Sequence, residues 1–233
     1  MAGMGAQSLE GKLMITKQEI GDCAEKYGLE QNVIEKDYVL SWVLAGIVQS
    51  EILREQWVFK GGTCLKKCYF EQYRFSEDLD FTLLEPDNFE VAVFFAEFKT
   101  ISDWVYQKSG VEFLQHDLVF EDYKNALGER SIQVKMSYLG PMGRRGSYPR
   151  IKLDLSCDEP LVCSPEWRAV SSVYSDETMG FKIKSYSLEE IFAEKLRALV
   201  QRLSPRDVYD VIRLYTYPMH TSFSRKIGTT RHT

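Results

Sequence analysis

Two short motifs in this chain carry residue types that suit phosphate and metal chemistry. The first is the turn Gly61-Gly62-Thr63, whose glycines let backbone N–H groups approach a phosphate and whose threonine adds a hydroxyl donor. The second is Asp78-Leu79-Asp80, which opens a run that alternates polar and apolar residues like a strand with one buried face. Asp78 and Asp80 therefore point the same way and can converge on hard cations such as Mg²⁺ or Mn²⁺. Together the two motifs indicate phosphoryl or nucleotidyl transfer.

A third carboxylate is expected on a neighbouring strand, because two-metal nucleotidyl transfer uses one to hold the ion that activates the attacking hydroxyl. Asp154 is the best candidate. In the segment 150–156 it shares one strand face with Lys152, while the aliphatic residues between them point to the core. The alternative is an ordinary polar face on an amphipathic strand. Because Asp154 follows an Asp-x-Asp strand in the chain, we favour the catalytic interpretation.

A helical segment near the C-terminus adds a lysine. The stretch that begins at Ser187 has the period of an amphipathic helix, with Ser187 as its cap and Glu190 three positions on, and Pro205 breaks it. Lys195 lies one turn from apolar residues on both sides, so it sits at the edge of the apolar stripe. From there its ammonium could reach a triphosphate. A surface lysine that extends its charge into water is the commoner case and is the alternative.

The motifs together resemble the AbiEii/AbiGii toxin family, nucleotidyltransferase-fold toxins of type IV-like bacterial toxin–antitoxin systems. The resemblance rests on FKGGTCLKKCYFEQYRFSEDLDF, on VIEKDYVLSWVL before it, on the strand around Asp154, and on AEKLRALVQRLSPRDVYDV. It covers roughly residues 36–214. It implies an α+β fold in which a mixed sheet of the nucleotidyltransferase type is flanked by helices, with a helical C-terminal part.

The motifs and the resemblance define a set of expected site residues. The expected metal ligands, which also act in catalysis, are Asp78, Asp80 and Asp154. The expected nucleotide-binding residues are Gly61, Gly62, Thr63, Lys152 and Lys195. The resemblance implies that Lys195 contacts the nucleotide phosphates and that Asp207 helps to complete the catalytic site.

The resemblance also implies a metal-dependent toxin that transfers NMP from an NTP to an RNA acceptor, and we expect the tRNA 3′ end. A cognate antitoxin encoded nearby is the expected partner. The loop with Arg144, Arg145 and Arg150, beside Tyr148, could meet RNA by charge and stacking or could be a solvated turn. The alternative functions are a nucleotide-binding regulatory protein of the same fold without turnover, and a transferase that acts on a small-molecule hydroxyl.

Hydrophobic periodicity places these motifs on helices and strands. Helices are expected over 16–49, with a capping box at Thr16 and Glu19, and over 63–70 and 89–109. Strands are expected over 57–60, 78–83, 111–113, 118–120, 131–138 and 150–156. We divide the chain into a disordered or tag-like N-terminus (1–15), a nucleotidyltransferase core with N-terminal helices (16–160), a C-terminal helical part (161–217) and a tail (218–233) consistent with a truncated chain.

The bulk properties narrow the class of protein. The net charge of −5 argues against a strongly basic nucleic-acid scaffold, but it leaves room for RNA binding through a local patch. No apolar run approaches the ~20 residues of a membrane span, so we expect a cytoplasmic protein with no membrane partner. The five cysteines have no second pair of soft ligands nearby, which favours small buried side chains over a zinc site. The pair Lys36-Asp37 is interpreted as an exposed helical turn, with support of the active site as the alternative.

Overall fold

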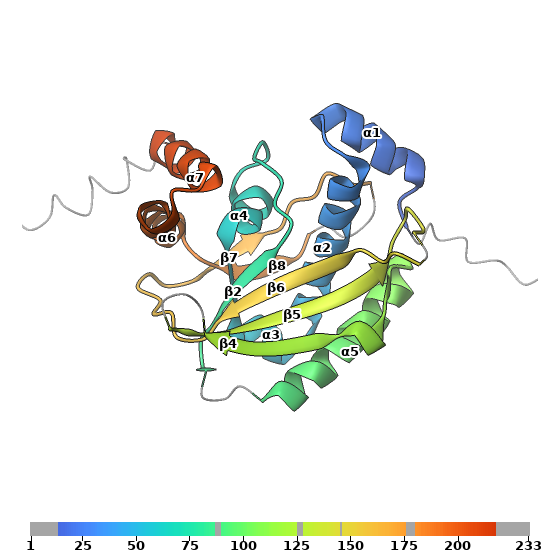
Figure 1. Cartoon of the computed structure of the whole chain (residues 1–233), viewed down its shortest axis with the longest axis horizontal. Coiled ribbons are helices and arrows are strands. Elements are labelled where there is room, and N and C mark those ends of the chain that lie inside the picture. Colours follow the sequence, from blue (N-terminus) through green and yellow to red (C-terminus); the bar gives the residue numbers. More distant parts are fainter. Residues whose placement is uncertain (1–13, 87–89, 125–127, 145, 176–179, 218–233) are drawn as a thin grey trace, which may run out of the picture.

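The fold is a mixed sheet packed against helices, as the computed structural model shows (Figure 1). The structure describes residues 14–86, 90–124, 128–144, 146–175 and 180–217. The tail 218–233 and nearly all of the N-terminal segment 1–15 therefore lie outside the described residues. The prediction of an α+β fold with a mixed sheet flanked by helices is confirmed.

Eight strands of the described residues form one sheet in the order β3-β5-β6-β2-β1-β8-β7, with β4 paired to β5. The strands are β1 (Trp57–Lys60), β2 (Leu79–Leu83), β3 (Glu112–Phe113), β4 (Val119–Lys124), β5 (Arg130–Leu139), β6 (Arg150–Ser156), β7 (Glu166–Ala169) and β8 (Lys182–Ser185). The sequence predicted the first six but not β7 and β8. Each of these two has four residues, too few for a clear alternation, and β8 pairs parallel to β1. The start of the expected C-terminal helical part thus belongs to the sheet.

The helices agree with the sequence predictions in part. They are α1 (Lys17–Tyr27), α2 (Gln31–Gln49), α3 (Glu51–Gln56), α4 (Gly61–Cys64) with a π-helical continuation (Leu65–Tyr69), α5 (Val91–Ser109), a 3₁₀ turn (Gln115–Asp117), α6 (Leu188–Arg202) and α7 (Pro205–Thr216). Helices α1 and α6 begin at their predicted caps, whereas α3 was not predicted and the helix expected over 63–70 is a short α-helix followed by a π-helical segment. The Thr16 hydroxyl accepts the N–H of Glu19 at 3.2 Å, and the Ser187 hydroxyl accepts the N–H of Glu190 at 3.2 Å. Both predicted caps are confirmed.

An aromatic cluster joins the centre of the sheet to α5. The Trp57 ring lies 5.1 Å from that of Phe81 on β2, and 5.6 and 5.7 Å from those of Phe94 and Phe98 on α5. All four side chains are buried, and such ring pairs stabilise beyond the area they bury. Helix α2 packs against α5 on the same side of the sheet (Figure 1). The strands that carry the two motifs are therefore supported from behind by a continuous core.

The pair Lys36-Asp37 on α2 differs from its predicted exposure. Asp37 is 2% exposed, and its carboxylate accepts hydrogen bonds from Lys67 Nζ at 3.1 Å and from the Tyr174 hydroxyl at 2.9 Å. Lys36 forms an ion pair with Glu77 at 3.3 Å. The exposed-turn interpretation is wrong for Asp37, because α2 is enclosed at this point and a buried charge requires a charged partner.

The cysteines are free thiols, and Cys64 and Cys157 are buried. None of the described helices is long and apolar enough to cross a membrane.

Candidate active site

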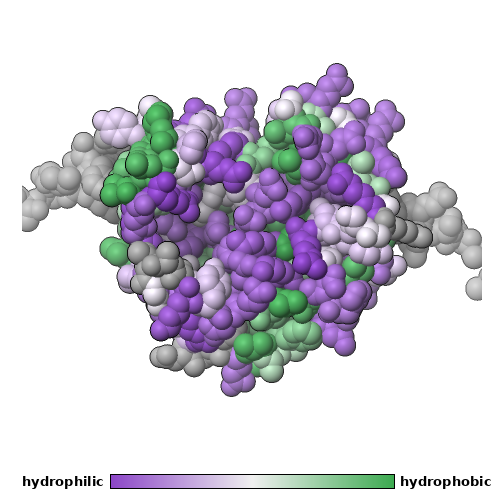
Figure 2. Space-filling model, in the orientation of Figure 1, coloured by the Kyte–Doolittle hydropathy of each residue, from purple (hydrophilic) through white to green (hydrophobic). Residues whose placement is uncertain are grey.

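Polar side chains form a row across one face of the sheet. Asp80 on β2 is the register partner of Lys60 on β1 and of Asp154 on β6, and Asp154 is the partner of Gln133 on β5. Register partners on adjacent strands project from the same face. Phe81, the residue after Asp80, points toward α5, so the row lies on the opposite face of the sheet, where Figure 2 shows mainly hydrophilic residues. The predicted meeting of the Asp-x-Asp strand with a third carboxylate thus has a direct structural basis.

The Asp80 carboxylate lies against the backbone of Gly61. A Cβ atom added to Gly61 would be 2.2 Å from Asp80 Oδ2, and Gly61 has φ +79°, so both the space and the backbone conformation require glycine. The sequence analysis assigned Gly61 to phosphate binding. In the structure, Gly61 makes room for an expected metal ligand.

Asp80 is in an environment that disfavours its own charge. Burial raises the pKa of Asp80 from 3.8 to about 6, the negative charge of Glu194 adds to this effect, and Lys60 opposes it. Among the described residues, no donor hydrogen-bonds the Asp80 carboxylate. A carboxylate in this setting gains stability from a bound cation.

Asp154 has partners from its own strand and from β5. Its carboxylate lies 2.6 Å from Lys152 Nζ and accepts a hydrogen bond from Gln133 Nε2 at 2.8 Å. Burial opposes the charge of Lys152, but the hydrogen bond to Asp154 and the negative charges of Asp154 and Asp78 together outweigh it and raise the pKa of Lys152. Lys152, expected to bind the nucleotide, is thus paired with an expected metal ligand at the more exposed end of the row.

The Gly-Gly-Thr motif forms the helical turn α4 and not an open loop. The Thr63 hydroxyl is buried and donates to the backbone carbonyl of Asp78 at 2.6 Å, so it fixes the start of β2 instead of facing a phosphate. At Gly62, an added Cβ would be 3.0 Å from Arg74 Nη2 and 3.3 Å from Ser76 Oγ. Gly62 therefore lets the Arg74 guanidinium approach the turn.

Lys195 belongs to a buried cluster of charges that links α6 and α7 to this turn. Its ammonium lies 3.3 Å from Asp210 Oδ2 on α7. Asp210 is fully buried and also accepts hydrogen bonds from Arg74 at 2.8 and 2.6 Å and from the Tyr73 hydroxyl at 2.7 Å. Burial opposes ionisation of Asp210, but the hydrogen bonds from Arg74 and the charge of Lys195 outweigh it and lower the pKa of Asp210. Lys195 is therefore not a surface lysine.

Asp207 lies one helical turn before Asp210 and binds a different partner. Its carboxylate accepts hydrogen bonds from Arg202 at 2.6 and 2.9 Å, and these bonds lower the pKa of Asp207. Asp207 thus links α7 to the end of α6. In this structure Asp210, and not Asp207, is the acidic residue of the helix that meets Lys195.

Four charged residues of the site were absent from the predicted set: Lys60, Arg74, Glu194 and Asp210. Lys60 Nζ lies 3.1 Å from Glu194 Oε1 and also pairs with Glu159, while Glu194 Oε2 is buried without a hydrogen-bond partner. One sequence signal could have found Asp210, since Asp207, Asp210 and Leu214 share the helical stripe that normally carries apolar residues. Lys60 and Glu194 carry no such signal.

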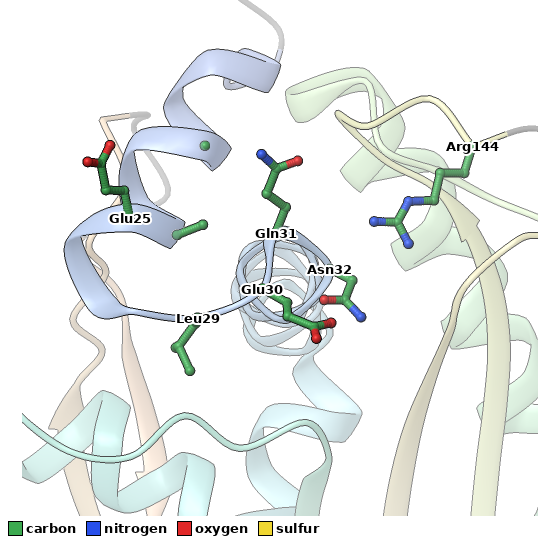
Figure 3. A pocket seen from close by; sticks show the side chains of 8 residues that line it. Glu25, Leu29, Glu30, Gln31, Asn32 and Arg144 are labelled. Atoms are coloured by element: carbon green, nitrogen blue, oxygen red, sulfur yellow. The ribbon is translucent and has the colours of Figure 1, made fainter.

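The arginine-containing loop between β5 and β6, for which the sequence left RNA contact and a solvated turn as alternatives, borders a separate pocket. This pocket has a volume of about 650 Å³ and lies between α1, α2 and the loop, where the Arg144 guanidinium points toward Gln31 and Asn32 (Figure 3). Tyr148 and Arg150 are exposed, and Arg145 lies outside the described residues. None of the carboxylates in the polar row lines the pocket, so the row remains on the open face of the sheet.

The mixed sheet, the paired aspartates and the glycine turn define a nucleotidyltransferase. A sequence model of the family described as "Nucleotidyl transferase AbiEii toxin, Type IV TA system" matches residues 42–227, and the chain belongs to this family. Membership implies an NTP substrate and an antitoxin. The structure is similar to the crystal structure of JHP933 from Helicobacter pylori, with a TM-score of 0.54 and 19% sequence identity. The match covers 82% of this chain and 70% of that chain, and it shows a similarity of fold. No curated protein matches the chain.

Proposed function

We propose that this nucleotidyltransferase uses Mg²⁺ or Mn²⁺ to transfer NMP from an NTP to the 3′-terminal hydroxyl of an RNA, with tRNA as the acceptor. One observation carries the proposal: Asp80 and Asp154 are direct register partners on the parallel strands β2 and β6, in a chain of the AbiEii family. Two carboxylates side by side on the open face of a sheet can bind a cation that also contacts the NTP phosphates.

The residues of the row fit a divalent cation. Asp80 has a raised pKa and no hydrogen-bond donor within the described chain, and Glu194 Oε2 is buried and unpartnered. Over the described residues, no three His, Cys, Asp or Glu side chains group into a metal site. We therefore assign two of the cation's ligands to the carboxylates of Asp80 and Asp154, with Asp78 beside them. Phosphate oxygens and water take the remaining coordination positions, as Mg²⁺ prefers. When bound, the cations supply charge neutralisation and activation of the attacking hydroxyl.

The remaining residues act on the substrates. Lys195 and Arg74, which Asp210 holds in place, supply positive charge for the triphosphate beside the Gly62 turn. Asp154 orients the acceptor hydroxyl and takes its proton. A bond forms from the acceptor oxygen to the α-phosphorus, the bond from that phosphorus to the bridging oxygen breaks, and pyrophosphate leaves.

The choice of an RNA acceptor is supported by the exposed loop that leads into β6. Arg150 lies four residues before Asp154, roughly 13 Å along the strand, and Tyr148 and Arg144 are exposed beyond it. Guanidinium groups and an aromatic ring suit phosphates and bases of a single-stranded RNA end. NTP and tRNA are both cytoplasmic, so we place the activity there, restrained by a cognate antitoxin encoded nearby.

The proposal is tested by incubating the protein with each α-³²P-labelled NTP, Mg²⁺ and total tRNA. We expect labelled tRNA with at least one NTP, and none after periodate oxidation of the tRNA 3′ end. Asp80→Asn and Asp154→Asn should abolish labelling. Asp103→Asn, which changes an exposed carboxylate on α5, is the matched control and should retain it. Binding of NTP without labelled RNA would show a nucleotide-binding protein and contradict the proposal.

Toxicity is tested separately in cells. Expression of the chain alone should slow growth, and Asp80→Ala at matched protein level should relieve the effect. Equal growth of the two strains would contradict the assignment of toxicity to this site, whatever the acceptor proves to be.

A further inference from the structure

Tyr123 on β4 places its hydroxyl against Asp154, the residue to which we assign the acceptor proton. The Tyr123 hydroxyl donates to Asp154 Oδ1 at 3.4 Å, and its side chain spans the intervening strand β5 to do so. Phe120, three residues earlier, packs against Phe98 on α5 with ring centres 5.7 Å apart. Because side chains alternate along a strand, Tyr123 lies on the open face of the sheet together with the polar row.

The ring of Tyr123 is held at one end and is accessible elsewhere. The residue is 39% exposed, and the bond from its hydroxyl to Asp154 fixes the tip of the side chain. Among the residues that the structure describes, no other aromatic ring packs against it, whereas Phe120 on the same strand contacts two rings of α5. An aromatic ring that is fixed at its tip and exposed on its surface suits stacking by a nucleobase.

The position of Tyr123 across the sheet matches the side from which the acceptor attacks. In an in-line displacement, the acceptor and the departing pyrophosphate lie on opposite sides of the α-phosphorus. The groups assigned to the triphosphate, Arg74 and Lys195, both bind Asp210 of α7. Strands β6, β5 and β4 follow β2 in this order, so β4 lies roughly 14 Å across the sheet from β2, away from α6 and α7 (Figure 1). Tyr123 therefore flanks the acceptor and not the pyrophosphate.

Asp154 can bind the terminal hydroxyl of an RNA without losing its own support. Gln133 donates to Asp154 Oδ1 at 2.8 Å and holds the carboxylate, whereas the bond from Tyr123 is long and therefore weak. The attacking hydroxyl can take the place of the Tyr123 hydroxyl. Because the same ribose carries this hydroxyl and the terminal base, the base then lies within reach of the Tyr123 ring. A small molecule without a planar ring would leave the Tyr123 ring uncovered.

We propose that Tyr123 stacks on the 3′-terminal base of the RNA acceptor and thereby selects acceptors whose attacking hydroxyl belongs to a nucleotide. This inference rests on the proposed transfer to RNA. The ring supplies the affinity for the base, and the hydroxyl only steadies the ring in the absence of RNA. Substitutions can separate these two parts of the side chain.

The test measures RNA binding with Mg²⁺ and without NTP, so that no transfer occurs. The probe is a 5′-fluorescein-labelled RNA hairpin with a short single-stranded 3′ end, and its twin carries an abasic ribose as the last residue. Anisotropy should show about 5- to 100-fold weaker binding of the abasic twin to the wild type, and equally weak binding of both RNAs to Tyr123→Leu. Tyr123→Phe keeps the stacking ring and should bind the intact RNA within about twofold of the wild type. Tyr106→Leu removes a tyrosine of α5 that is 55% exposed and is the matched control, with binding unchanged.

Circular dichroism checks that each variant is folded. Absence of RNA binding by the wild type, or equal binding of the two RNAs to it, overturns the proposal. So does binding by Tyr123→Phe as weak as that by Tyr123→Leu, which would leave the bond to Asp154 as the role of Tyr123.

The labelling reaction separates this inference from the transfer reaction on which it rests. Tyr123→Leu should raise the KM for RNA and leave the KM for NTP unchanged, whereas the reverse would place the NTP base on the ring and overturn the proposal. Absence of labelling by the wild type, with the difference in binding between the two RNAs retained, would contradict the transfer reaction and support the stacking.

Discussion

Asp80→Asn should make the metal-free protein more stable while it destroys the reaction. In the fold the pKa of Asp80 is about 6, against an ordinary value of 3.8, because the half-buried carboxyl is partly desolvated and lies near Glu194. The folded state therefore binds this proton more tightly than the unfolded chain. Wild-type stability should fall as the pH rises from about 4 to about 6, and Asn, which cannot ionise, should escape that loss.

The size of the effect follows from the two pKa values. At pH 8, ionising Asp80 in the fold costs about 3 kcal/mol relative to the unfolded chain, and at pH 4 the difference is about 0.6 kcal/mol. Asp80→Asn should thus raise the free energy of unfolding by up to about 3 kcal/mol at pH 8, equivalent to about 6–12 °C in Tm for a domain of this size.

The assay is urea denaturation of EDTA-treated protein, followed by the fluorescence of its four tryptophans at pH 4 and pH 8. Asp154→Asn is the matched control, because it removes an acceptor of Lys152 and Gln133 and should be neutral or destabilising. Mg²⁺ should stabilise the wild type and not Asp80→Asn. If Asp80→Asn is no more stable than the wild type at pH 8, or if its gain is the same at pH 4, the account of Asp80 is wrong.

Three further predictions address the turn, the lysine and the buried ion pair. Gly61→Ala should lower kcat of transfer about a hundredfold, because its Cβ would displace the Asp80 carboxylate. Gly28→Ala is the control, because Gly28 has a similar φ of +63° but open space around it, so this variant should lose stability and keep its activity. Equal activity losses in the two variants would refute this reasoning. Lys195→Ala should lower kcat/KM for NTP about 10- to 100-fold and Lys195→Arg should restore part of it, whereas a loss under about twofold would remove Lys195 from the site. Asp37→Asn should lower the free energy of unfolding, measured in urea, by about 3–5 kcal/mol, because it leaves the buried Lys67 without its charged partner. The transfer activity per folded molecule should be retained. Unchanged stability would show that the ion pair is dispensable.

Local patterns of the sequence determined the elements that carry the site. The alternation of polar and apolar residues located β2 and β6 and identified the faces of Asp80 and Asp154, and side-chain caps located the starts of α1 and α6. These signals are local because a strand's period, a cap and a proline break each act within a few residues. The sequence could therefore state which way each aspartate points relative to its own strand.

Only the tertiary structure decided what each side chain meets. Thr63 turned out to hold the Asp78 carbonyl, Asp37 to bind a buried lysine, and Asp210 to meet Lys195. The four-residue strand β8 pairs with the edge of β1, and its own alternation of polar and apolar residues is too short to predict a strand. In each case the partner comes from an element distant in the chain. The period of a helix or strand sets the direction of a side chain, but the packing of other elements against it sets its contacts.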